Sequence, residues 1–167
     1  ILVEGVSEET YLRYEIDRHP TLKNHHIKVY RIDGAYAHQF ISLLDLLEIK
    51  TVIFTDLDLK RSESEKIVDI KDNGSPDIIP TNISDLKEKY GEIENSLIST
   101  NGTIQYFLKK ELNDDKAKSD RINSLLIEIL TNKEELIFEH KNISMYSQGK
   151  INGFYATSFE ESIVLTN

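Results

Sequence analysis

The feature that most constrains the fold is an alternation of strand and helix patterns over the first 58 residues. Three short runs at 1–3, 27–32 and 51–55 are rich in β-branched and aliphatic residues, as strands are. The stretches between them carry apolar residues at helical spacing. This order predicts an α/β fold, with a mainly parallel central sheet and helices packed on its faces.

The remainder of the chain predicts one domain with an inserted helical segment. Residues 60–77 are rich in charge and Ser, which favours an irregular loop. Residues 143–148 and 154–156 have the pattern of two short strands in a hairpin-like arrangement. Helix patterns occupy three stretches, namely 102–112, 120–130 and the one that starts at Ser158.

Acidic residues follow two of the predicted parallel strands. Glu4 comes directly after the first strand, and Asp56 and Asp58 come directly after the third. Because ligands of such sheets bind beyond the carboxyl ends of the strands, we expect these side chains to lie at one edge. Glu8 lies about one helical turn beyond Glu4 and could reach the same place.

Carboxylates in this arrangement suit hard divalent cations. Mg²⁺ and Mn²⁺ prefer oxygen ligands. Two such ions about 4 Å apart can activate a water and stabilise both oxygens of a phosphodiester cleavage. Glu160, near the end of the chain, is a further candidate. Glu4 could instead act as a general acid or base if nearby aspartates raise its pKa.

A purely structural interpretation of the same residues stays open. Glu8 and Glu160 both lie in the first turn of a predicted helix, where negative charge interacts favourably with the helix dipole. An isolated Asp-x-Asp in a loop is usually only solvated. The joint arrival of Glu4 and Asp56 at one sheet edge favours the functional interpretation.

Two motifs together resemble the toprim domain of topoisomerases, primases and certain nucleases. They are Leu-Val-Glu-Gly-Val-Ser-Glu-Glu at 2–9 and Ile-Phe-Thr-Asp-Leu-Asp at 53–58. Ser-Thr-Asn-Gly-Thr-Ile at 99–104, the turn near 155–157 and Ser-Phe-Glu-Glu at 158–161 are similar to the OLD (overcoming lysogenization defect) nucleases. That family includes the nuclease subunit of Gabija anti-phage defence.

The resemblance implies a Rossmann-like toprim domain over 1–167 that cleaves DNA with two Mg²⁺ or Mn²⁺ ions. It implies metal ligation by Glu4, Glu8, Asp56, Asp58 and Glu160. Among these, Glu4, Asp56 and Asp58 are the residues that it implies to be catalytic.

The resemblance also implies parts of a longer polypeptide. The family has an upstream ATPase domain and a Lys downstream of the Ser-Phe-Glu segment, so we expect the chain to be a fragment that is weak or inactive alone. For the full-length protein, the resemblance implies a homo-oligomer, DNA as substrate, and a helicase-like partner in anti-phage defence.

Composition agrees with a metal-dependent rather than a basic DNA-binding surface. The chain has 29 Asp and Glu against 20 Lys and Arg, a formal net charge of −9. A protein that holds DNA through its own surface is usually basic, so we expect metal ions to offset phosphate charge. The absence of Cys excludes a disulfide framework and a thiolate zinc site. No apolar run is long enough to span a membrane, and we expect a cytoplasmic protein.

Two other functions agree with part of the sequence. A phosphatase of the haloacid dehalogenase type also has Asp-x-Asp after an apolar strand, but it requires Thr or Val where this chain has Lys60. It also places that motif after its first core strand, whereas Glu4 and Gly5 precede the motif here. The other alternative is a toprim-like module that assembles with a partner and has no chemistry.

Overall fold

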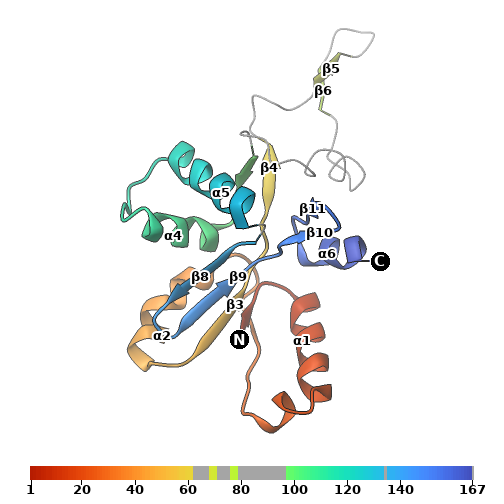
Figure 1. Cartoon of the computed structure of the whole chain (residues 1–167), viewed down its shortest axis with the longest axis vertical. Helices are drawn as coiled ribbons and strands as arrows, with labels where there is room; N and C mark the ends of the chain where they lie inside the picture. Colours follow the sequence, from red (N-terminus) through yellow and green to blue (C-terminus); the bar gives the residue numbers. More distant parts are fainter. Residues whose placement is uncertain (62–67, 71–75, 79–96, 134, 167) are drawn as a thin grey trace.

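A mainly parallel five-stranded sheet forms the centre of the computed structural model, which describes residues 1–61, 68–70, 76–78, 97–133 and 135–166 (Figure 1). Its strands are β1 (Leu2–Val3), β2 (Tyr30–Arg31), β3 (Thr51–Phe54), β8 (Ile137–His140) and β9 (Ile143–Tyr146). They lie in the order β2-β1-β3-β9-β8. β1 pairs in parallel with β2 and β3, β3 pairs in parallel with β9, and β8 pairs antiparallel with β9. The predicted α/β class is confirmed.

Helices lie on both faces of this sheet (Figure 1). The described helical elements are α1 (Val6–Arg18), η1 (Leu22–Asn24), η2 (Ala37–Phe40), α2 (Ile41–Leu47), α4 (Gly102–Glu111), α5 (Ser119–Lys133) and α6 (Phe159–Thr166). α4 and α5 are inserted between β3 and the β8–β9 pair, which agrees with the predicted helical insertion.

Three short antiparallel strand pairs lie outside the central sheet. They are β4 (Leu59–Arg61) with β7 (Leu97–Ser99), β5 (Val68–Ile70) with β6 (Pro76–Ile78), and β10 (Lys150–Ile151) with β11 (Phe154–Tyr155). The loop predicted for 60–77 therefore contains strand residues where the structure describes it, and 62–67 and 71–75 lie outside the described residues.

The main core lies on one face of the sheet. Alternate residues of β3 and β9 turn fully buried side chains, such as Ile53 and Met145, toward this face. They belong to one apolar cluster with residues of η2, α2, α4 and α5, namely Ala37, Ile41, Ile104, Phe107, Leu108, Ile122, Leu126 and Leu130. The other face, which carries the partly buried Phe54 and Tyr146, is covered by α1 and α6.

The predicted hairpin between 143–148 and 154–156 is wrong. Residues Ile143–Tyr146 form β9, which lies between β3 and β8 in the central sheet. The actual partner of β11 is β10. β9 joins β3 across nearly a hundred residues, and such a long-range parallel pairing leaves no local turn signal.

The apolar residues of the first helix, whose helical spacing predicts a buried face, are less buried than that spacing predicts. Tyr11 and Tyr14 are 47% and 52% exposed, and Glu8 is the buried residue of α1. α1 covers the less occupied face of the sheet, so its apolar side chains gain only partial burial. Among the described residues, no helix combines the length and apolar character that a membrane span requires.

We expect Leu126→Ala on α5 to lower the free energy of unfolding by about 2–5 kcal/mol, because it removes a side chain that packs within the core. Leu126 is 1% exposed. The matched variant Leu46→Ala on α2, where the side chain is 79% exposed, should change that free energy by less than about 0.5 kcal/mol. Urea unfolding of both variants measures the difference, and equal losses would contradict this assignment of the core.

Candidate functional site

The carboxyl ends of β1 and β3 bring Glu4 and Asp56 together. Neighbouring parallel strands end at one edge of the sheet, and Leu2 of β1 is in register with Ile53 of β3. Glu4 Oε1 accepts a hydrogen bond from the backbone N–H of Asp56 at 3.1 Å and another from the Thr55 hydroxyl. The first carboxylate is thus fixed directly to the end of the strand that carries the second.

Asn101 connects three parts of this edge. Its side chain is fully buried, and Nδ2 donates to Glu4 Oε1 at 2.8 Å, to the Asp56 carbonyl at 2.9 Å and to Asp58 Oδ2 at 3.1 Å. Its Oδ1 accepts the backbone N–H groups of Thr103 and Ile104, so Asn101 is also the N-cap of α4. One amide therefore orients two carboxylates from the start of a core helix.

Asp56 is also held by Gln148, which follows β9 in the chain, and by the start of α6. Its Oδ1 accepts hydrogen bonds from Gln148 Nε2 at 2.5 Å and from the backbone N–H of Phe159, in the first turn of α6, at 2.9 Å. Gln148 Oε1 in turn accepts the N–H of Leu57 at 3.2 Å. Among the described residues, the hydrogen bonds to this carboxylate engage Oδ1, which leaves Oδ2 for another partner.

Asp58 leaves the strand conformation in a way that aims its side chain at the same edge. Its φ of 46° is left-handed, a conformation that Asp tolerates better than most residues. The backbone there is tied on both sides, because Asp58 N–H donates to the Thr157 carbonyl and the Asp58 carbonyl accepts from Thr100 N–H. Asp56 and Asp58 therefore both contribute to the edge.

Glu8 has a structural role as well as a place beside Asp56. It is 6% exposed, and its Oε2 accepts the backbone N–H of Gly5, the N-cap of α1, at 3.1 Å. A Cβ at position 5 would lie 2.8 Å from that same oxygen. Glycine at position 5 thus leaves room for the close approach of the Glu8 carboxylate.

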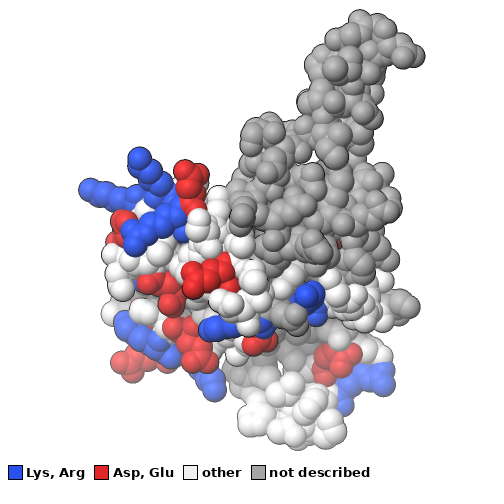
Figure 2. All heavy atoms as spheres, turned by 45° about the horizontal axis from the view of Figure 1, so that its top comes forward, with Lys and Arg blue, Asp and Glu red and all other residues white. Residues whose placement is uncertain are grey.

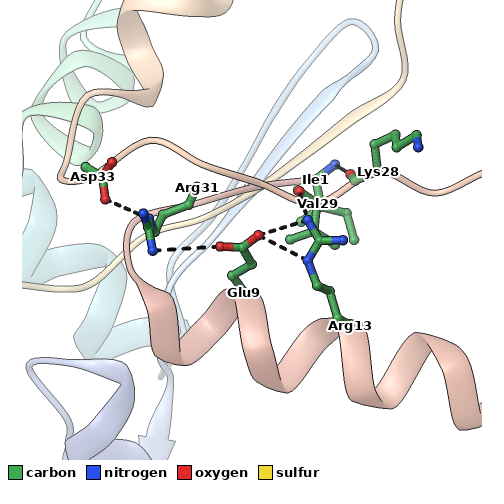
Figure 3. A network of polar contacts seen from close by, with 7 residues as sticks. All are labelled: Ile1, Glu9, Arg13, Lys28, Val29, Arg31 and Asp33. Carbon is green, nitrogen blue, oxygen red and sulfur yellow. Dashed lines mark hydrogen bonds and ion pairs between the residues drawn. The ribbon is translucent and has the colours of Figure 1, made fainter.

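The neighbouring Glu9 points away from this edge and is neutralised. Figure 3 shows its carboxylate between Arg13, at 2.8 Å, and Arg31, at 4.0 Å. Arg31 also pairs with Asp33 at 2.7 Å. Of two consecutive glutamates, one is therefore buried beside the aspartates and the other belongs to a surface ion-pair network.

The hydrogen bonds of Glu160 differ from those of the other four carboxylates. It is exposed in the first turn of α6, and hydrogen bonds with Ser7 and Ser158 lower its pKa. Ser158 Oγ accepts the N–H of Glu161 at 3.3 Å, as an N-cap side chain does at the start of a helix. The metal-ligand role expected for Glu160 stays a prediction.

The pKa of Asp56 shows that the four remaining carboxylates form one electrostatic unit, named here the acidic cluster (Glu4, Glu8, Asp56 and Asp58). The pKa of Asp56 is raised to about 7, first by burial and then by the negative charges of Glu4, Glu8 and Asp58, while the hydrogen bond from Gln148 acts in the opposite direction. Burial also raises the pKa of Glu4 above its usual range, and the charge of Asp58 adds to this.

The donor set of the acidic cluster suits a hard divalent cation. All four members offer carboxylate oxygens, and the negative charges of Glu4, Glu8 and Asp58 add to the effect of burial in raising the pKa of Asp56. Within the described part of the chain, no three acidic or histidine side chains already converge closely enough to hold an ion. Their oxygens are instead held by Asn101, Thr55, Gln148 and backbone N–H groups.

Sequence reasoning did not assign a role to Asn101 or Gln148. An Asn before the helical pattern at 102–112 is a recognisable N-cap signal and could have placed Asn101 at the start of a helix. Gln148 has no such signal, because it reaches Asp56 only through the parallel pairing of β9 with β3.

In EDTA, the free energy of unfolding of the wild type should fall as the pH rises from about 4 to about 7. We expect this fall to be smaller in Asp56→Asn. The pKa of Asp56 is about 7 in the folded protein and returns to about 3.9 on unfolding. The proton therefore stabilises the fold at low pH, and that contribution is lost as the pH rises through about 7. Urea unfolding at several pH values measures it. Glu4 keeps some slope in the variant, and an unchanged or steeper slope would contradict the shift.

Comparisons with known proteins agree with this geometry. The family model described as "Overcoming lysogenization defect protein-like, TOPRIM domain" matches residues 1–58, which end at Asp58. Endonuclease GajA of Bacillus cereus (strain HuB5-5) is 39% identical over 170 aligned residues, which cover 100% of this chain and 19% of GajA. The chain thus spans about a fifth of the length of this curated relative. No solved structure matches the chain significantly.

The matched segment contains β1, α1, β2, α2 and β3 and so delivers every member of the acidic cluster. The α/β fold and the similarity to GajA extend the agreement over the rest of the chain. The chain therefore belongs to the OLD-family toprim domains.

Proposed function

We propose that this chain is the catalytic toprim domain of a divalent-metal-dependent DNA endonuclease. The observation that carries the proposal is the convergence of Glu4, Asp56 and Asp58 on shared hydrogen-bond partners at one sheet edge, with the charge of Glu8 also acting on Asp56. A cluster of repelling, partly buried carboxylates costs stability, and a cation removes that cost. The relative GajA is named as an endonuclease, which supports the same reaction for this domain.

The acidic cluster would hold Mg²⁺ or Mn²⁺, with two ions as the proposed number and Glu160 as a further ligand. When bound, such ions activate a water, hold the phosphate and stabilise the leaving oxygen. Glu4, Asp56 and Asp58 are the proposed catalytic residues, because they lie at the ends of β1 and β3 and share hydrogen-bond partners.

The residues around the cluster set its geometry and protonation. Asn101 orients Glu4 and Asp58 from the rigid start of α4. Gln148 and the first N–H of α6 fix Oδ1 of Asp56. Near neutral pH, Asp56 shares its carboxyl between the protonated and charged forms, so binding of a cation would release a proton there.

A basic region of the described surface is a candidate for contact with DNA. Figure 2 shows Lys and Arg side chains gathered at its left edge, over the end of α4 and the start of α5. The charge there is partly offset, because Lys110 pairs with Asp115 at 3.2 Å and Arg121 pairs with Asp114 at 3.1 Å. With a net charge of −9, the chain would depend on bound cations to offset phosphate charge.

The larger context follows from the length of the relative. Because GajA is about five times as long as the aligned segment, we propose that this domain is part of a longer polypeptide with an ATPase domain. We further propose that the full-length protein is a cytoplasmic homo-oligomer that acts on DNA in anti-phage defence, together with a helicase-like partner.

Two other functions would be revealed by distinct results. A phosphatase would hydrolyse a generic aryl phosphate, and Asp56→Asn would abolish that activity. An assembly module without chemistry would fold normally and fail to bind Mg²⁺ or Mn²⁺. In the described residues, nothing in the surroundings of Asp56 favours either function over the nuclease.

In the full-length protein, Glu4→Ala and Asp56→Ala should each reduce Mn²⁺-dependent nicking of plasmid DNA by about 100-fold or more. Bound ions contribute several kcal/mol to stabilisation of the transition state, and each factor of ten is about 1.4 kcal/mol. Glu9→Ala is the matched control, since Glu9 is paired with Arg13 outside the cluster. A loss in Glu9→Ala equal to that in Glu4→Ala, or nicking at the wild-type rate by either cluster variant, would refute the assignment.

A metal titration checks the site without measuring cleavage. Mn²⁺ should raise the thermal midpoint of the wild type by several degrees, because a ligand that binds the folded state stabilises it. Asp56→Asn should show a much smaller rise, whereas Glu9→Gln should respond as the wild type does. No rise in the wild type would favour the assembly module.

A further inference from the structure

A pocket of about 300 Å³ adjoins the acidic cluster on the less covered face of the sheet. Its walls come from α1, the ends of β3 and β9, and the first residue of α6, and they include Tyr11, Leu12, Phe54, Tyr146, Ser147 and Phe159. The volume is at the lower end of the range for small-molecule sites, which suits one nucleoside-sized group.

Two aromatic pairs form much of the wall. The rings of Phe54 and Tyr146 lie 5.9 Å apart on the sheet side, and those of Tyr11 and Phe159 lie 5.5 Å apart on the helix side. Tyr11 is 47% exposed, so the pocket opens to solvent along α1. Aromatic walls of this kind favour a flat ring that can stack on them.

The polar groups of the pocket favour a neutral ligand with hydrogen-bond donors. Glu8 and Asp56 line it, and their negative charge disfavours a phosphate in the pocket itself. A ring that carries amino or imino donors would satisfy these carboxylate acceptors while it stacks on the aromatic wall.

The position of the pocket limits what can occupy it during catalysis. Asp56 belongs both to the acidic cluster and to the pocket wall. A group in the pocket would therefore lie next to whatever phosphate the cluster acts on. In a DNA strand, the neutral, flat and donor-bearing group beside a phosphate is a nucleobase.

We propose that this pocket binds one nucleobase of the DNA substrate, adjacent to the phosphodiester that is cut. The inference rests on the nuclease function proposed above and adds a base-binding subsite to it. The subsite makes Phe54, Tyr146 and Tyr11 determinants of where the strand is cut.

The test uses the full-length protein and a DNA duplex whose cut position has been mapped. Single abasic sites are introduced at each nucleotide near that position, and kcat and KM are measured with Mn²⁺. For the wild type, one position should show a fall in kcat/KM of about 10- to 100-fold, the range expected from loss of one stacked base. Loss of the base at other positions should have smaller effects.

Tyr146→Leu and Tyr11→Leu remove aromatic walls and keep apolar volume. Each variant should cut intact DNA more slowly than the wild type does. In each variant, removal of the base should lower kcat/KM much less than in the wild type (the abasic penalty), because the aromatic ring on which the base stacks is already missing. Tyr11 is half exposed, so its variant keeps the test valid if Tyr146→Leu fails to fold. Tyr30→Leu, at a 60% exposed tyrosine on β2, is the matched control and should keep the full penalty.

The outcomes separate this inference from the function on which it rests. Wild-type cleavage with no position-specific abasic penalty would overturn the subsite and leave the nuclease intact. A full penalty in both pocket variants would overturn it as well and would indicate that another surface holds the base. Absence of metal-dependent cleavage of intact DNA by the wild type would overturn the nuclease proposal itself.

Discussion

Repulsion among carboxylates at one edge of the parallel sheet is the constraint to which the rest of the site responds. Parallel strands end together, so acidic residues that follow β1 and β3 must lie close to one another. The surrounding donors reduce the cost, with Asn101 between Glu4 and Asp58, and Gln148 and the start of α6 on Asp56. The pKa of Asp56 still rises to about 7, because burial and the negative charges of Glu4, Glu8 and Asp58 outweigh these donors. A divalent cation is the charge that such an arrangement lacks.

The two faces of the sheet divide the tasks of stability and binding. One face carries the main apolar core, where α4 and α5 pack on Ile53 and Met145. The other is only partly covered by α1 and α6, which leaves exposed aromatic side chains and a pocket. Asn101 caps α4 and also binds the acidic cluster, so the helix that packs in the main core fixes the position of the cluster. The open face is where a substrate can enter.

Much of this could be predicted from local patterns. The alternation over 1–58 predicted the mainly parallel sheet, and the placement of Glu4 and Asp56 at its edge followed from that topology. The faces of α1 were not predictable in the same way, because Tyr11 and Tyr14 have helical spacing but meet little covering structure. The sheet partner of β9 was not predictable either, because its residues have the local pattern of a hairpin strand and pair instead with β3. Local periodicity reports which face is apolar and not which partner covers it.

The sequence alone determined the alternation of strands and helices in the first 58 residues and the acidic residues that follow its strands, because hydrophobic periodicity and strand-end position are local properties. Tertiary structure decided the rest of the site. It separated Glu8, buried beside Asp56, from Glu9, which Arg13 and Arg31 neutralise. It also brought Asn101 and Gln148 to carboxylates that lie more than 90 positions away in the chain. Contacts over such separations depend on how helices and strands pack, which no short stretch of sequence encodes.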